Sequence, residues 1–406
     1  MTLRSRLPAA LVVLVVFGQQ VATVAALGDA LSPLADPFSE ANAIRSGEGY
    51  AEQGFTRHAG LPMPGYGDRF PETGFRLQGT AVYTHYPPGP DLLVGVLTKA
   101  FGAGHVGLYR IAPLLVGLLS LAAFAGLLAR AFGPLAAAGL LAVCALAPMF
   151  GNMMHGLHYQ GYAFSLLLVE LGLLIRLFGP HAVERPARHL AALSALGFLQ
   201  GWLSFDYCFL VTFAPLPFAL LWAEPPRRER IRRAALAIVL LGSGFTLAHG
   251  LHFAQVVAFH GGIEPAFEDL GASAQQRAAA PALADRVRLV WEYATLHAPS
   301  APFFSWALPL AWIGFLASWI VNRGAVESFE PVRGRAEWHV RRGRSVAAVA
   351  AAFAVSLTWV ALMWEHAADH LHFLPRHLFL FYFLCWLVPL AGGLGNERAS
   401  APPRSA

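Results

Sequence analysis

Residues 188–223 read RHLAALSALGFLQGWLSFDYCFLVTFAPLPFALLWA, and this stretch decides how the whole chain is laid out. At about 1.5 Å per residue in a helix, it is too long for a single crossing of a bilayer. Basic clusters flank it on both sides, and such clusters remain on the cytoplasmic side of a membrane. The chain is therefore predicted to cross twice here and to turn on the other side at 204–207. These clusters are Arg176, Arg185 and Arg188 at its start, and Arg227, Arg228, Arg230, Arg232 and Arg233 after its end.

The same reasoning applied to every apolar run predicts about ten transmembrane helices in one all-α domain spanning 1–406. Ten spans place every arginine cluster, including the loop 322–344, on one side of the membrane, with both termini cytoplasmic. The run 7–27 could alternatively be a cleaved signal peptide, but its length favours a retained first helix. The predicted spans are 7–27, 106–129, 134–150, 161–178, 188–203, 207–223, 233–258, 303–321, 345–364 and 374–393.

The composition agrees with a membrane protein. Hydrophobic residues make up 56% of the 406-residue chain and charged residues only 13%, too few to cover a soluble domain of this length. The net charge of +5 arises from arginines in particular loops, which indicates topology rather than nucleic-acid binding. Lys99 is the only lysine, and together with abundant Ala, Gly and Pro this favours a GC-rich bacterial genome.

Two long loops are predicted on the non-cytoplasmic, periplasmic side. The first covers 28–105 and should contain short helices near 39–58 and 91–101, the second of which is too short to span and should lie at the membrane interface. The other loop covers 259–302. The sequence shows no internal repeat, which argues against an inverted-repeat transporter.

Four acidic residues, Asp36, Glu40, Glu48 and Glu52, follow the first span closely. A carboxylate that is partly desolvated at the water boundary can act as a general base. Each of them could instead be a solvated loop residue, and Asp36 could cap the helix that begins at Pro37.

Further polar residues gather in the predicted outer loops. His85 and Tyr86 precede two prolines that would hold them on a stiff turn at the membrane surface. Arg110 opens the second span, where it could grip a phosphate or extend toward lipid headgroups.

Two later clusters complete this set. The first is a short loop that contains His155, His158, Tyr159 and Gln160, with Asp206 in a neighbouring turn. The second, at 364–377, ends in Arg376 and His377, where a charged residue enters a span and is therefore a functional candidate. Hydrogen bonding to a ligand is the simpler role for the histidines. Their spacing also permits a divalent cation, but it does not specify a complete ligand set.

These motifs together resemble the GT-C superfamily of polyprenyl-phosphate-dependent glycosyltransferases, most of all the branch of protein O-mannosyltransferases and aminoarabinose transferases. The resemblance rests on an early acidic segment, Tyr83-Thr84-His85-Tyr86-Pro87-Pro88, a short helix ending in Phe101-Gly102, and Arg110. It is best over about 28–150, and Pro375-Arg376-His377 is similar to the arginine before the last helices of the family.

The resemblance implies a mechanism, in which an acid of the first loop deprotonates an acceptor hydroxyl and this hydroxyl displaces the lipid phosphate with inversion. It implies Glu40 or Asp36 as the base, with Arg110 and Arg376 on the phosphate. Family members commonly have adjacent Asp-Glu, whereas this chain has Ser39-Glu40 with Asp36 three residues earlier, so both acids stay candidates.

The implied partners are a polyprenyl-phosphate sugar, a lipid, glycan or protein acceptor, and the membrane, with no nucleic acid. A transporter or flippase for a lipid-linked saccharide is one alternative, although its polar residues should lie near mid-bilayer. An O-antigen ligase or polymerase is another, although its main outer loop should come late in the chain.

Overall fold

The computed structural model describes residues 3–33, 36–70, 82–145, 148–179, 182–222, 225–278, 284–285, 288, 333–365 and 374–393. Within these ranges the regular structure is helical. The upright bundle consists of α1 (Leu3–Leu27), α5 (Ile111–Phe132), α6 (Pro134–Ala145), α8 (Tyr159–Phe178), α9 (Ala187–Leu203), α10 (Cys208–Phe213), α11 (Pro215–Leu221), α12 (Arg227–His260), α16 (Arg333–Leu362) and α19 (Phe379–Gly393). The shorter or peripheral helices are α2 (Pro37–Gln53), η1 (Arg57–Gly60), α3 (Gly89–Phe101), α4 (Val106–Tyr109), α7 (Pro148–Met153), α13 (Ile263–Ala278) and α18 (Leu374–His377).

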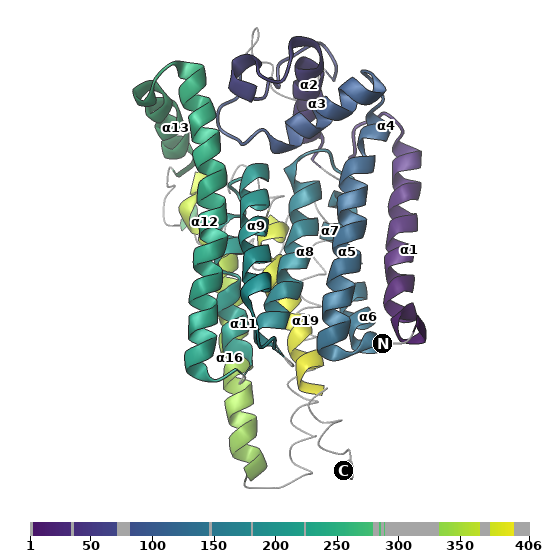
Figure 1. Ribbon diagram of the computed structural model, residues 1–406, viewed down its shortest axis with the longest axis vertical. Helices are drawn as coiled ribbons and strands as arrows, with labels where there is room; N and C mark the ends of the chain where they lie inside the picture. Colours follow the sequence, from purple (N-terminus) through teal and green to yellow (C-terminus); the bar gives the residue numbers. More distant parts are fainter. Residues whose placement is uncertain are drawn as a thin grey trace.

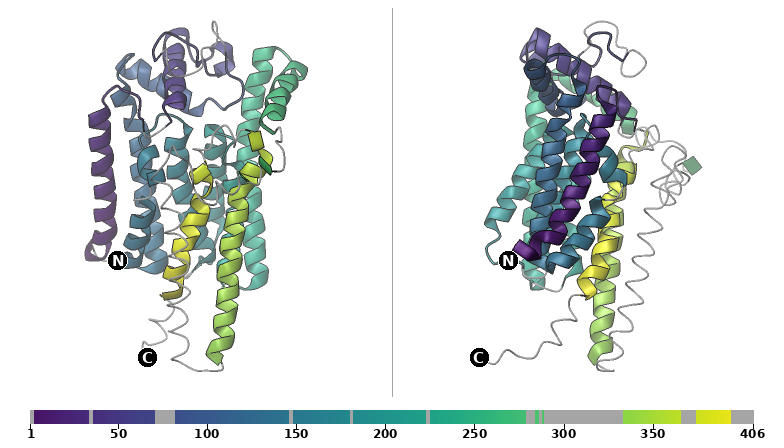
Figure 2. Two further views of the ribbon diagram at one scale, coloured as in Figure 1. Left: turned by 180° about the vertical axis from the view of Figure 1, so that it is seen from behind. Right: turned by 90° about the vertical axis from the view of Figure 1, so that its right-hand side faces the viewer.

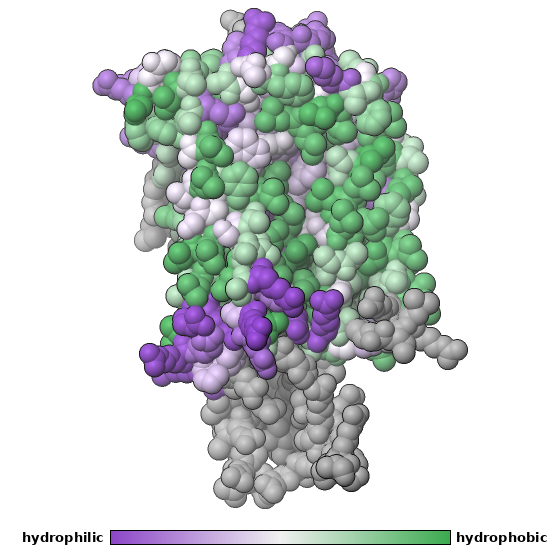
Figure 3. All heavy atoms as spheres, in the orientation of Figure 1, coloured by the Kyte–Doolittle hydropathy of each residue, from purple (hydrophilic) through white to green (hydrophobic). Residues whose placement is uncertain are grey.

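The long helices form an upright bundle with an apolar surface, as expected of a multi-pass membrane protein. Among the described residues, five helical segments are long and apolar enough to cross a bilayer: Leu7–Leu27, Val106–Phe132, Tyr159–Phe178, Arg227–His260 and Gly343–Leu362. Pro134–Ala145, Cys208–Leu221 and Phe379–Val388 are shorter apolar helices. Figure 3 shows the resulting green belt, with hydrophilic residues above and below it.

The two ends of the bundle differ. Helices α2 and α3 lie across one end, beside the top of α12 and α13, and we call this the capped end (Figure 1). The N-terminus of α1 and the arginine-rich start of α12 lie at the opposite end (Figures 1 and 2). The predicted short helices of the first loop are confirmed as α2 and α3 and share one end of the molecule.

The double passage predicted at 188–223 also appears as two helical segments with a turn between them. Helix α9 ends at Leu203 and α10 begins at Cys208, so the chain reverses at the predicted turn. Helix α9 packs against α12, and α10 contacts both. The predicted span 303–321 lies outside the described residues.

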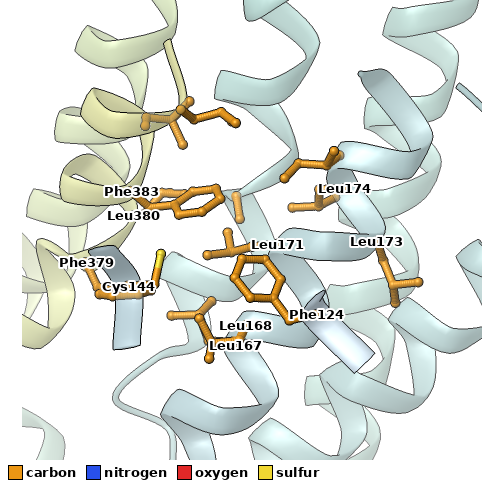
Figure 4. Packing of buried hydrophobic residues seen from close by; sticks show 14 of the residues in the cluster. Phe124, Cys144, Leu167, Leu168, Leu171, Leu173, Leu174, Phe379, Leu380 and Phe383 are labelled. Atoms are coloured by element: carbon orange, nitrogen blue, oxygen red, sulfur yellow. The ribbon is translucent and has the colours of Figure 1, made fainter. Parts of the chain in front are cut away.

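Helix α8 lies in the middle of the bundle, and most of its residues are buried. Its leucines pack against α5, α6 and α19, where Phe124, Cys144 and Phe383 meet them (Figure 4). Because water is absent from a bilayer core, such packing rather than hydrophobic exclusion holds membrane helices together.

Close approach between helices depends on glycines in two places. A Cβ atom at Gly244 of α12 would lie 2.4 Å from the Ser194 carbonyl oxygen of α9. A Cβ atom at Gly47 of α2 would lie 2.5 Å from Cγ1 of Val94 in α3. Small residues let helix backbones approach each other closely, and here they press α2 onto α3 above the bundle.

Three predicted boundaries differ from the structure. Helix α16 begins at Arg333, inside the predicted loop 322–344, since arginine, glutamate and alanine favour helix. The second span is divided at Arg110 into α4 and α5. The span at 207–223 is divided at Ala214, where Pro215 cannot donate a helix hydrogen bond.

Candidate functional site at the capped end

Asp36 caps the start of α2 at the capped end of the bundle. Its Oδ1 accepts a hydrogen bond from the Ser39 backbone N–H at 3.1 Å, and its Oδ2 accepts one from the Ser39 hydroxyl at 2.6 Å. The side chain is buried, with the residue 6% exposed. The predicted helix cap is therefore present, and it places a carboxylate against the N-terminus of α8.

Charges around Asp36 favour its ionised form. Burial raises the pKa of Asp36, but the neighbouring His158, the hydrogen bonds from Ser39 and the charge of Arg376 hold the pKa below its ordinary value of 3.8. The Asp36 backbone N–H lies 3.4 Å from Nε2 of His158. Burial lowers the pKa of His158 to about 3, so at neutral pH its imidazole is neutral, and the charge that still acts on the Asp36 carboxylate is that of Arg376.

Glu40 and Arg110 form a fully buried ion pair. Arg110 Nη1 lies 2.6 Å from Glu40 Oε1, and Nη2 lies 3.1 Å from Oε2. The same guanidinium donates to the carbonyl oxygens of Ala30 and His155. This paired arrangement joins the loop before α2 to the junction of α4 and α5.

Glu48 and Glu52 also have partners within the first loop. Glu48 accepts a hydrogen bond from Arg69 Nε at 2.6 Å, and Glu52 accepts one from the Tyr66 hydroxyl at 2.6 Å. Arg45, on the same helix, donates to the backbone carbonyls of Pro64, Arg69 and Phe70. These residues shape the loop over α2.

His155 is held by hydrogen bonds on both ring nitrogens. Nε2 lies 2.8 Å from the Ser32 hydroxyl and Nδ1 lies 3.0 Å from Gln20 Oε1 in α1. Burial, with a smaller effect of the Arg110 charge, lowers the pKa of His155 to about 4. The neutral imidazole therefore ties α1 to the α7–α8 loop.

Arg376 enters the site from α18 and is 2% exposed. Its charge acts on Asp36 and His158. The next residue, His377, lies between two rings, 4.3 Å from the Trp359 centroid and 5.1 Å from the Tyr207 centroid, stacked on both. Residues that are distant in sequence thus form one wall of the site.

Aromatic rings continue this wall toward the rim. Tyr86 stacks on Phe205 with centroids 4.9 Å apart and on Tyr159 with centroids 6.1 Å apart. The Tyr159 hydroxyl donates to Asp206 Oδ2 at 2.6 Å, and Gln160 Nε2 donates to the Tyr159 hydroxyl at 2.9 Å. This chain fixes the start of α8 to the turn between α9 and α10.

The sequence reasoning did not single out α13, whose side chains meet the Tyr83–Tyr86 turn. Asp269 accepts hydrogen bonds from the Thr84 hydroxyl, from His85 Nε2 at 3.3 Å and from His260 Nε2 at 3.1 Å. Burial raises the pKa of Asp269, but these hydrogen bonds hold it below its ordinary value.

Arg277, at the other end of α13, was missed as well. It donates to the Tyr83 hydroxyl at 3.1 Å, and its guanidinium lies 5.2 Å from the Tyr86 ring and 4.9 Å from the Phe205 ring. The contact exists because the fold brings α13 next to the Tyr83–Tyr86 turn. The spacing of residues in 263–278 does not indicate a contact with residue 83.

A metal centre finds no support in the part of the chain that is described: those residues hold no group of three or more His, Cys, Asp or Glu side chains suited to a metal ion. The predicted acid and histidine cluster at 366–373 lies outside the described residues.

The predicted site residues thus fall into two layers. Eight of them interact with one another at the capped end, in a region that we call the mouth: Asp36, Tyr86, His158, Tyr159, Gln160, Asp206, Arg376 and His377. Glu40, Arg110 and His155 form a hydrogen-bonded layer next to it. His85 lies at the rim, where it contacts Asp269 of α13.

A solved structure with a similar architecture gives this geometry a context. It is the crystal structure of ArnT from Cupriavidus metallidurans bound to undecaprenyl phosphate. This chain is similar in fold to ArnT. The TM-score is 0.53 at 17% sequence identity, and the match covers 98% of this chain and 60% of the ArnT chain.

This likeness and the long apolar helices confirm the predicted fold class, an all-α polytopic membrane protein. The chain spans about 60% of the length of the ArnT chain. Neither a protein-family model nor a curated protein matches the sequence.

Proposed function

We propose that this protein is a membrane glycosyltransferase that moves a sugar from a polyprenyl-phosphate donor to an acceptor hydroxyl, with Asp36 as the general base. The observation that carries the proposal is the buried carboxylate of Asp36, on which the charge of the buried Arg376 acts, at the capped end of a bundle that is similar in fold to ArnT. A base beside a cation suits a reaction in which a hydroxyl loses a proton and a phosphate leaves.

Comparison of the four acids supports Asp36 rather than Glu40 as the base. Each oxygen of Glu40 accepts hydrogen bonds from Arg110 and from a backbone N–H, so neither has an open position for a hydroxyl. Glu48 and Glu52 accept hydrogen bonds from Arg69 and Tyr66 of the first loop. The partner of Asp36 is Ser39, whose hydroxyl can rotate away.

In the proposed reaction the acceptor hydroxyl attacks the anomeric carbon of the donor sugar. As the new C–O bond forms, the hydroxyl proton passes to Asp36, and the bond between the anomeric carbon and the phosphate oxygen breaks. The electron pair leaves with the polyprenyl phosphate, whose charge Arg376 stabilises. Attack in one step from the opposite face inverts the anomeric centre.

The remaining site residues have supporting roles in this proposal. The Glu40–Arg110 pair fixes the loop that presents Asp36, a role that replaces the phosphate grip expected for Arg110. Arg277 adds a second positive charge, after that of Arg376, at the Tyr83–Tyr86 turn. Tyr86, Tyr159 and Tyr207 form a wall of rings against which the apolar face of a sugar can pack.

The finer assignments are proposals as well. We place the mouth on the periplasmic side of the bacterial inner membrane, since the arginines gather at the opposite end of the bundle. We place the chain near the protein O-mannosyltransferase and aminoarabinose transferase branch, with a lipid, glycan or protein as acceptor.

The test is an assay of the purified protein in proteoliposomes containing radiolabelled polyprenyl-phosphate sugars and candidate acceptors. We expect labelled sugar to appear on an acceptor with inverted anomeric configuration, while free polyprenyl phosphate accumulates in equal amount. Movement of intact donor across the vesicle membrane without transfer would show a flippase and overturn the proposal.

A further inference from the structure

Helix α13 has three distinct faces: one that packs on the protein, one that is charged and polar, and one that is apolar. At about 100° per residue, positions 266, 269, 270, 273 and 277 fall on one face. Ala266 and Ser273 of this face are buried, and Asp269 and Arg277 reach the Tyr83–Tyr86 turn. This face fastens the helix to the protein.

A second face carries the water-soluble residues. Glu264, Glu268 and Gln275 share it, and all three are exposed. The two carboxylates have no ion-pair partner among the described residues, as expected of side chains in water.

The third face is apolar and uncovered. It consists of positions 263, 267, 271, 274 and 278, which are Ile, Phe, Gly, Ala and Ala. Ile263 is 61% exposed and Phe267 is 62% exposed, although both are large hydrophobic side chains. Within the part of the chain that the structure describes, no side chain therefore covers this apolar stripe along the helix.

This stripe continues the membrane-facing surface of α12. The Phe267 ring lies 4.8 Å from the Phe253 ring of α12, and on α12 Leu247 and Leu251 are 60% and 46% exposed. Helix α13 lies beside the upper part of α12, next to the green belt (Figures 1 and 3). The lipid acyl chains that cover Leu247 and Leu251 can therefore cover Ile263 and Phe267 as well.

We propose that α13 binds the lipid surface through this third face, with Ile263 and Phe267 among the acyl chains and Glu264 and Glu268 in water. A helix with separate apolar and charged faces lies in the plane of the headgroups and gains stability from the apolar area that it buries. A second copy of the chain is a poorer occupant, because one narrow stripe is small beside the roughly 800 Å² that each partner of a stable complex buries.

Binding of α13 to the lipid surface would also affect the mouth, and this consequence rests on the proposed function. Helix α13 is bonded to the Tyr83–Tyr86 turn by Asp269 and Arg277. Lipid that holds α13 at headgroup depth would therefore hold Arg277 and the turn at the depth where the phosphate of a lipid-linked donor lies.

The experiment measures depth and not catalysis, so it stands whether or not sugar transfer is found. Spin labels are attached in nanodiscs at Ile263→Cys and Phe267→Cys, with Glu264→Cys and Glu268→Cys as matched controls on the water face. Cys144, Cys208 and Cys385 are replaced beforehand. Label collisions are then compared for oxygen, which concentrates in lipid, and for a water-soluble nickel chelate.

We expect oxygen collisions to dominate at 263 and 267 and nickel collisions to dominate at 264 and 268. Nickel collisions dominating at all four positions would overturn the proposal. So would weak collisions with both reagents at 263 and 267 together with spin–spin broadening, since that result would show a second copy on this face.

Discussion

Each carboxylate oxygen of Glu40 accepts two hydrogen bonds inside the protein, from Arg110 and from the backbone of Ser32 or Leu157. Buried ion pairs contribute little net stability when complete, but removing one partner leaves the other charge stranded. A substitution of Glu40 can therefore distinguish a structural role of this carboxylate from a catalytic one.

Replacing Glu40 by Gln is expected to lower the free energy of unfolding by about 3–5 kcal/mol, because Arg110 would then be an uncompensated buried charge. Denaturant titration in detergent measures the effect. Glu52→Gln is the control, since Glu52 is exposed, and should change stability by about 0.5 kcal/mol or less. A stable Glu40→Gln protein that had lost sugar transfer would instead make Glu40 the base.

Glu170 provides a second test at this scale. It is fully buried in α8, and within the described residues neither of its carboxylate oxygens has a hydrogen-bond partner. Replacing Glu170 by Leu should raise the free energy of unfolding by about 1–3 kcal/mol, because an unsatisfied polar group is removed. Glu170→Gln keeps the polarity and should change it little. Destabilisation by Glu170→Leu would reveal a partner for the carboxyl.

The sequence alone could select the acids of the first loop but could not rank them. Their ranking depends on partners far along the chain: Arg110 for Glu40, Arg376 for Asp36. No spacing rule connects residues that tertiary packing brings together. For the same reason Asp269 and Arg277 were not predicted, whereas His158, Tyr159 and Asp206, which the structure brings together, could be selected from their place in short loops.

At the scale of elements, hydropathy predicted where the helices lie, because long apolar runs must form helices in a bilayer. It did not predict the divisions at Arg110 and Ala214, nor α13. A buried arginine or a proline interrupts a helix without shortening the apolar run. An amphipathic helix has too little mean hydropathy to stand out.

Helix contacts at the capped end give an element-scale prediction. Replacing Gly47 by Val should force α2 from α3, since a Cβ atom there would lie 2.5 Å from Val94 Cγ1. We expect a loss of about 1–3 kcal/mol of unfolding free energy, as overpacking usually costs. Gly126→Val in α5 is the matched control, because no heavy atom lies within 4 Å of a Cβ there. Equal effects at both positions would show that only helix propensity is involved.

At the scale of the molecule, the arginine-rich start of α12 and the capped end lie at opposite ends of the bundle (Figure 1). The ten-span prediction followed from this separation of charge, and the ArnT-like fold agrees with a multi-pass membrane protein. Which end faces the cytoplasm is a matter of charge bias alone and requires its own experiment.

Single cysteines at two exposed positions test this orientation in a cysteine-free background. Glu264→Cys lies at the capped end and Arg228→Cys at the other. An impermeant maleimide should label position 264 in cells whose outer membrane alone is permeabilised, and position 228 only after lysis. Labelling of 228 in unlysed cells, with protection of 264, would reverse the topology and place the mouth in the cytoplasm.

The central claim is that Asp36 takes the acceptor proton at the mouth of the bundle. The most direct measurement is the single-turnover rate of sugar transfer by Asp36→Asn in proteoliposomes, with donor binding and unfolding measured on the same preparation. We predict a rate lower by about 10²-fold or more, with folding retained and donor still bound. A rate within about twofold of the unmodified protein would contradict the account.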